Sequence, residues 1–219
     1  MTGEQNQEQV GTEFIKLLKL MDRLRSPGGC SWDRKQTHRS LLPYLIEETY
    51  EVVEAIEATA QVDYGLLAEE LGDLLLHVVF QARIASEVSD RQGGFSMLEV
   101  ITALNEKLLR RHPQVFSDQQ GQQEDDHQRW ERIKEQEKPQ RRQPFDGIPP
   151  HLPALALAQK TAARARKHGV DLALEQQSAG VKDERQLGAL LFNLVVSAEQ
   201  EGLDAERALR SFTRDLIQS

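Results

Sequence analysis

The chain of 219 residues carries 27 Lys and Arg against 35 Asp and Glu, so it is long enough for a buried core, and its net charge of −8 disfavours a nucleic acid polymer as partner. Its single cysteine, Cys30, excludes an intramolecular disulfide and, with a polar N-terminus unlike a signal peptide, predicts a cytoplasmic protein. The most apolar stretch, LGDLLLHVVF, contains Asp73 and His77 and is too short to span a membrane.

The chain is predicted to be all-α. Leu, Ala, Glu, Gln and Arg dominate, and apolar residues recur at intervals of three and four, whereas alternating β-branched runs are rare. The predicted helices of the first half span residues 14–24, 40–60, 64–88 and 96–111, and the segment GGCSWDRKQT between the first two is predicted to be a loop. Four helices with short connections indicate a four-helix-bundle-like domain.

A polar, glutamine-rich linker follows these helices. It begins after Pro113 and contains the segment HQRWERIKEQEK, which predicts a short helix. Four prolines between residues 144 and 153 then separate a C-terminal unit. The predicted domains are therefore residues 1–138, a helical domain ending with the linker helix, and residues 139–219.

The C-terminal unit contains a degenerate copy of part of the first domain. Residues 69–75 match residues 185–191, and residues 95–111 match residues 203–219. Apolar positions persist, but four charged residues are replaced: Glu70 by Gln186, Asp73 by Ala189, Lys107 by Asp215 and Arg111 by Ser219. We interpret this unit as a shorter, non-catalytic helical repeat that serves dimerisation or packing. Chance similarity between two Leu-rich helices is the alternative.

Two of the predicted helices each turn a pair of carboxylates inward. At 100° per residue, Glu48 lies within the apolar arc of its helix and Glu51 lies at the edge of that arc. The helix over 64–88 is apolar almost all round, and Glu70 and Asp73 lie on its one narrow polar stripe. Unpaired charges inside a bundle are costly, so a positive group must lie between the helices. Oxygen-only ligands suit one or two Mg²⁺ ions, with Mn²⁺ as a substitute. Neutralisation by cationic side chains and a solvated acidic face are the alternatives.

Other side chains carry candidate roles. Lys107 and Arg111 lie one turn apart on the predicted helix over 96–111, where they can meet phosphate oxygens or simply be solvated. Trp130 in the linker helix can stack on a nucleobase or anchor that helix by packing. His77 shares the polar stripe with Asp73 and is interpreted as a buried, hydrogen-bonding histidine rather than a metal ligand. Packing is favoured for Trp32.

The ordered motifs resemble a known family. Glu47-Glu48-Thr49-Tyr50-Glu51, followed after 18 residues by Glu70-Leu71-Gly72-Asp73, resembles the EExxE and ExxD signature of the MazG-type nucleoside triphosphate pyrophosphohydrolases. The likeness runs from LLKLMDRLRSPGGCSWDRKQT through NEKLLRRHPQVF to RWERIKEQEK, about residues 14–138. It implies an all-α fold, a homodimer, Mg²⁺ dependence, and hydrolysis of a nucleoside triphosphate to the monophosphate and pyrophosphate, with residues 1–138 as the catalytic domain.

The resemblance also implies site residues. By the family pattern, the metal ligands are Glu48, Glu51, Glu70 and Asp73, the phosphate-binding residues are Lys107 and Arg111, and the aromatic residue near the base is Trp130. In the expected reaction a water attacks the α-phosphorus, Glu48 positions the metal, and either Glu47 or Glu51 orients the water. Lys107 and Arg111 then neutralise the leaving pyrophosphate.

Two rival interpretations differ in class. A regulatory bundle derived from the same fold would bind nucleotides or a protein partner without catalysis, as the loss of charges in the C-terminal copy illustrates. A di-iron carboxylate bundle needs Glu-x-x-His on two helices. The chain has that spacing only at Glu124 and His127, in the polar linker, which disfavours the di-iron interpretation.

Overall fold

The computed structural model describes residues 3–57, 61–88, 90–116, 126–137, 143–172 and 183–218. Within these ranges every regular element is a helix, which confirms the all-α prediction, and none of the described helices is long and apolar enough to cross a membrane. The chain divides into two compact units, residues 1–121 and residues 122–219. They are described separately below.

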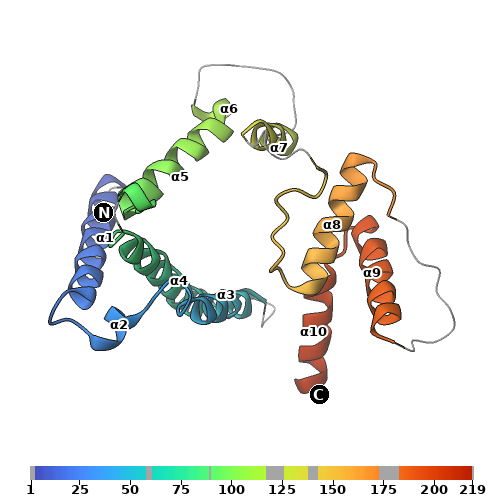
Figure 1. Cartoon of the computed structure of the whole chain (residues 1–219), viewed down its shortest axis with the longest axis horizontal. Helices are drawn as coiled ribbons and strands as arrows, with labels where there is room; N and C mark the ends of the chain where they lie inside the picture. Colours follow the sequence, from blue (N-terminus) through green and yellow to red (C-terminus); the bar gives the residue numbers. More distant parts are fainter. Residues whose placement is uncertain are drawn as a thin grey trace. The chain divides into compact units, whose positions relative to one another are not determined.

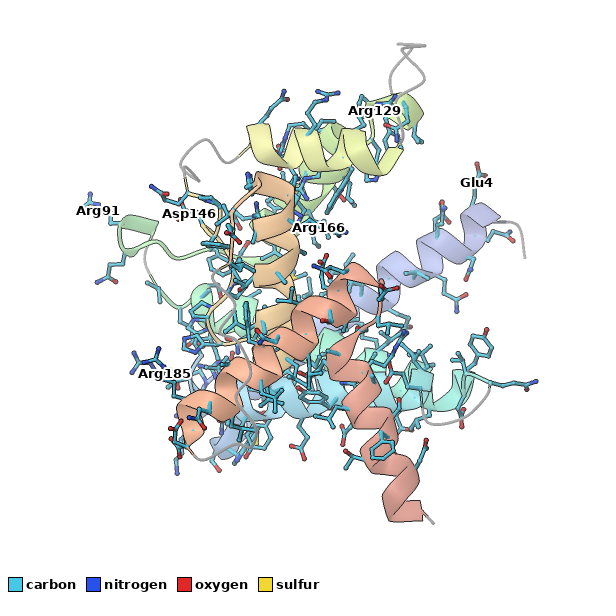
Figure 2. The ribbon with its side chains drawn as sticks, turned by 90° about the vertical axis from the view of Figure 1, so that its right-hand side faces the viewer. Glu4, Arg91, Arg129, Asp146, Arg166 and Arg185 are labelled. Carbon is cyan, nitrogen blue, oxygen red and sulfur yellow. The ribbon has the colours of Figure 1, made fainter. Side chains whose placement is uncertain are left out.

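The first predicted helix, over 14–24, is too short: the observed helix begins at Gly3, and residues 3–13 are too polar to show apolar periodicity. The observed helices of the first unit are otherwise close to the predicted ones (Figure 1). They are α1 (Gly3–Arg25), α2 (Ser31–Lys35), α3 (Leu42–Glu57), α4 (Tyr64–Ala85), the 3₁₀ turn η1 (Asp90–Gln92), α5 (Met97–Arg111) and α6 (Pro113–Phe116). The structure corrects the predicted loop after α1, because that segment contains α2. A helix of five residues is too short for apolar periodicity to reveal it. The N-terminal end of α1, marked by Glu4 in Figure 2, is exposed.

Local sequence signals explain where these helices begin and end. The Asp63 side chain accepts hydrogen bonds from the amides of Gly65 and Leu66 and so caps α4. Ser96 and Glu99 form a complete capping box at the start of α5. After α1 the chain reverses through Gly28, whose φ of 81° lies in the left-handed region that favours glycine.

The core of the first unit lies around the C-terminal half of α4, which packs against α1, α3 and α5. The buried core residues are Met21, Leu41, Val79, Phe80 and Ile84. Although α4 is apolar almost all round, its N-terminal half is not covered on every side, because Leu66 and Leu71 are exposed there, and Leu75 just beyond is exposed as well. In the described part of the chain α3 packs only on α4, and α5 packs only on α4 and α6. No further helix therefore covers this half.

The second unit contains α7 (Asp126–Gln136), α8 (Ala154–His168), α9 (Glu184–Gln200) and α10 (Ala205–Gln218). Helix α8 packs against both α9 and α10. Arg166 of α8, labelled in Figure 2, forms an ion pair of 2.6 Å with the buried Glu199 of α9. The Gln159 side chain bonds both the Leu203 carbonyl and the Ala205 amide. These contacts tie the three helices together.

The division of the chain and the predicted domain boundary differ in one respect. The predicted boundary after residue 138 assigns the linker helix, α7, to the first domain, whereas the division after residue 121 groups it with α8, α9 and α10. Helices α9 and α10 cover the segments that the repeat matches to α4 and α5, so the structure is compatible with a two-copy arrangement. The non-catalytic role of the second unit stays a prediction.

Candidate active site

The two acidic motifs face each other because α3 and α4 run antiparallel. Leu41, directly before α3, shares a core cluster with Phe80 near the end of α4. At the other end of the pair, the amide of Asp63 donates to the carbonyl of Ala55, 3.3 Å away. The middle of α3, which carries EExxE, therefore lies opposite the first half of α4, which carries ExxD.

Three of the four predicted metal ligands converge in this region. Glu48 and Glu51 of α3 and Glu70 of α4 each offer a carboxylate oxygen, and these oxygens lie within 4.8 Å of one another. All three side chains are half-buried. Asp73, one turn beyond Glu70, is also half-buried and close enough for its charge to act on both Glu48 and Glu70. We call these four residues the acidic cluster.

Burial and mutual repulsion raise the pKa values of two acids in the acidic cluster. Burial, together with a hydrogen bond to Glu51 and the negative charges of Glu51, Asp73 and Glu70, raises the pKa of Glu48 to about 7. Burial and neighbouring carboxylates, Glu51 first among them, also raise the pKa of Glu70. The protein alone thus retains a proton on this cluster near neutral pH. A hard divalent cation fits the all-oxygen donor set and can displace that proton.

The structure does not bring every predicted site residue to the acidic cluster. Glu47 is exposed on α3 and lies outside the group of converging oxygens. Lys107 and Arg111 lie in the second half of α5, which leads away from the α3–α4 pair toward α6 (Figure 1). Trp130 belongs to the second unit, where its ring lies 4.4 Å from the ammonium group of Lys134.

His77 is buried, as predicted, on the stripe that carries Asp73. Its Nδ1 atom has no hydrogen-bond partner among the described residues, so the predicted hydrogen-bonding role is not seen at that atom. Burial lowers the pKa of His77, and the charge of Asp73 opposes this effect. The net effect favours the neutral form of the ring.

Sequence reasoning assigned no role in the site to the residues around α2, which contact both α3 and α4. Trp32 of α2 is half-exposed and makes an edge contact with Tyr44, the rings being 6.0 Å apart. His38 donates from Nδ1 to the Oε1 atom of Gln81 on α4. Arg25, at the end of α1, is buried. A charged residue in the last turn of a helix is usually solvated, so no sequence signal distinguishes Arg25 from its neighbours.

Comparisons with known proteins identify the family. Residues 36–116 match the model of the MazG nucleotide pyrophosphohydrolase domain, a range that includes the whole acidic cluster. The chain is 41% identical to the nucleoside triphosphate pyrophosphohydrolase/pyrophosphatase MazG of Thermotoga maritima over 96% of this chain and 85% of that protein. It is 40% identical to the nucleoside triphosphate pyrophosphohydrolase of Escherichia coli, over 90% of this chain and 82% of that protein. The chain belongs to the MazG family.

Proposed function

We propose that the protein hydrolyses nucleoside triphosphates to nucleoside monophosphate and pyrophosphate in the presence of Mg²⁺. The observation that carries this proposal is the convergence of Glu48, Glu51 and Glu70, whose carboxylate oxygens lie within 4.8 Å of one another. The names of the relatives, which describe nucleoside triphosphate pyrophosphohydrolases, support the same reaction. The single cysteine agrees with action in a reducing cytoplasm.

The acidic cluster is the part of the chain that would hold the metal. Glu48, Glu51, Glu70 and Asp73 would bind Mg²⁺, with Mn²⁺ as a substitute, and the raised pKa of Glu48 supports a cation at this point. When bound, the ion supplies positive charge to the phosphate oxygens and makes water a better nucleophile. In the metal-free protein Glu48 and Glu51 share a hydrogen bond, and the proton in it would leave when the cation binds.

The remaining steps use the side chains of the protein. A carboxylate, Glu51 or the neighbouring Glu47, orients a water for attack on the α-phosphorus and accepts its proton. The new phosphorus–oxygen bond forms as the bond to the α–β bridging oxygen breaks, and pyrophosphate leaves with that oxygen. Lys107 and Arg111 neutralise the leaving group, and Trp130 stacks on the base.

A homodimer would complete this site. Apolar side chains are exposed on α3, α4 and α5, among them Ile46, Leu71 and Leu104, and one unit of a monomer rarely leaves so many uncovered. We propose that a second copy packs on this face. The second copy then covers the N-terminal half of α4, and its α5 can bring Lys107 and Arg111 to the acidic cluster that α5 of the same chain leads away from.

Pyrophosphate release tests the proposal. We would assay a panel of ribo- and deoxyribonucleoside triphosphates with Mg²⁺ and with EDTA, for the wild type, Glu48→Gln and the matched control Glu54→Gln. Glu54 is exposed on the same helix and lies outside the converging oxygens. The expected result is monophosphate plus pyrophosphate with Mg²⁺ in the wild type and control, and neither product with EDTA or in Glu48→Gln. A folded wild type that binds triphosphates without turnover would instead identify a regulatory module.

A further inference from the structure

The buried Arg25 joins three separate segments of the first unit. Its Nε and Nη2 atoms donate to the two carboxylate oxygens of Glu87, just beyond α4, each at 2.8 Å. Its Nη1 atom donates to the backbone carbonyls of Asp33, at 2.5 Å, and Gln36, at 3.3 Å. Its guanidinium carbon lies 5.4 Å from the ring centre of Phe80. The Arg25 side chain is 4% exposed and the Glu87 side chain 40%, so the guanidinium is shielded from solvent while its carboxylate partner is partly open to it.

The two carbonyls belong to residues 31–40, which we call the anchored segment. None of the residues of α2 within it is buried, so its apolar packing is limited to surface contacts such as that of Trp32 with Tyr44. The turn that follows is closed by reciprocal hydrogen bonds between Thr37 and Ser40 and by a bond of 2.6 Å from Ser40 to the Gln36 side chain. The segment is therefore internally ordered, and Arg25 is the buried group that fixes it to the rest of the unit.

The anchored segment contacts both helices that carry the acidic cluster. Its Trp32 contacts Tyr44, which lies one helical turn before Glu48 on the same face of α3. Its His38 bonds Gln81, which lies about 12 Å beyond Asp73 along the axis of α4. The segment therefore lies toward the end of the α3–α4 pair where α4 ends. A nucleotide that is held at the acidic cluster and extends in this direction would meet it.

We propose that Arg25, paired with Glu87, is a positioning residue for substrate binding: it holds the anchored segment against α3 and α4 as a wall of the nucleotide site. This inference rests on the proposed function. Arg25 acts through the segment, whereas the carboxylates that would bind the metal come from α3 and α4. Loosening the segment therefore weakens binding of substrate and transition state alike, which raises KM and leaves kcat nearly unchanged.

The kinetic test compares two identical substitutions. Arg25→Lys keeps the charge, but one ammonium group cannot bond Glu87 and both carbonyls at once. Arg83→Lys is the matched control, because Arg83 also bonds Glu87, at 3.0 Å, while its other partners Asp22 and Ser86 lie outside the anchored segment. We expect KM for the best triphosphate to rise about tenfold in Arg25→Lys with kcat within about twofold, and both constants to stay within about twofold in Arg83→Lys. An unchanged KM in Arg25→Lys, or a fall in kcat alone, would overturn the inference.

A second readout is independent of catalysis. In a Trp130→Phe background, Trp32 is the remaining tryptophan of the chain, and its fluorescence anisotropy reports the order of the anchored segment. The anisotropy should fall in Arg25→Lys and stay unchanged in Arg83→Lys; equal values in all three proteins contradict the anchoring role. A wild type without pyrophosphate release refutes the proposed function, and the anisotropy then decides the anchoring role by itself.

If circular dichroism shows that Arg25→Lys does not fold, Glu87→Gln takes its place in both measurements. Glu87→Gln weakens the pair but leaves the bonds from Arg25 to Asp33 and Gln36 in place. It should raise KM about threefold and lower the anisotropy of Trp32 in the same direction. A folded Glu87→Gln variant with wild-type values of both would overturn the inference.

Discussion

The charge repulsion in the acidic cluster predicts how metal-free stability depends on pH. Raising the pKa of Glu48 from 4.5 to about 7 corresponds to about 3 kcal/mol in the folded state, and the half-open position of the cluster reduces this to about 1 kcal/mol. The folded pKa of this acid lies above its unfolded value, so ionising it costs stability. The metal-free protein should lose about 1 kcal/mol from this group as the pH rises from 5 to 8.

Glu48→Gln should abolish that loss. With EDTA present, the variant should be about 1 kcal/mol more stable than the wild type at pH 8 and about equal to it at pH 5, as measured by urea unfolding followed by circular dichroism. Using the difference between the two proteins removes the contribution of His77, whose lowered pKa acts in the opposite direction. Adding Mg²⁺ should stabilise the wild type and not the variant. A difference that does not change between pH 5 and pH 8 would refute the reasoning.

Three further outcomes test the packing, the capping and the buried ion pair. Leu41→Ala should cost about 3 kcal/mol in urea unfolding, because Leu41 is 1% exposed within the core. Ser96→Ala should cost about 1 kcal/mol by the same measurement, since it removes the capping box of α5, and no loss would contradict the cap. A hydrogen bond from Arg25 holds the pKa of Glu87 below its usual value, so the wild type should lose more stability than Glu87→Gln as acid is added below about pH 4.5.

The sequence predicts the helices of this protein well because their signals are local. The Ser96 cap, the glycine turn after α1 and the apolar spacing within α4 each act over a few residues. The structure has a helix at each place predicted in the first unit, although α1 begins at Gly3 rather than at residue 14. The pairing of EExxE with ExxD is predicted for the same reason, since the turn between α3 and α4 is short. Helical periodicity then suffices to bring Glu48 and Glu70 to facing sides.

What the sequence misses depends on contacts between distant residues. Arg25 and Glu87 are 62 positions apart, and neither periodicity nor capping links them. Burial of the acidic cluster is overestimated for a related reason. Angular placement tells which face of α4 is apolar, but not whether another helix of the same chain covers that face. Of the long helices that the structure describes, α4 is the only one that α5 contacts. Leu71 and Leu75 of α4 stay exposed.

Each of the two units has a corresponding apolar helix face that its own helices leave uncovered. The repeat matches Leu71 and Leu75 of α4 to Leu187 and Leu191 of α9, and all four side chains are exposed in their own units. Between the same positions the second copy has replaced Asp73 by Ala189, so the apolar pattern is retained where the charge is lost. A face that serves only catalysis has no reason to keep its leucines once its acids are gone. The retained leucines therefore favour a packing or dimerisation role for the second unit, with catalysis confined to the first.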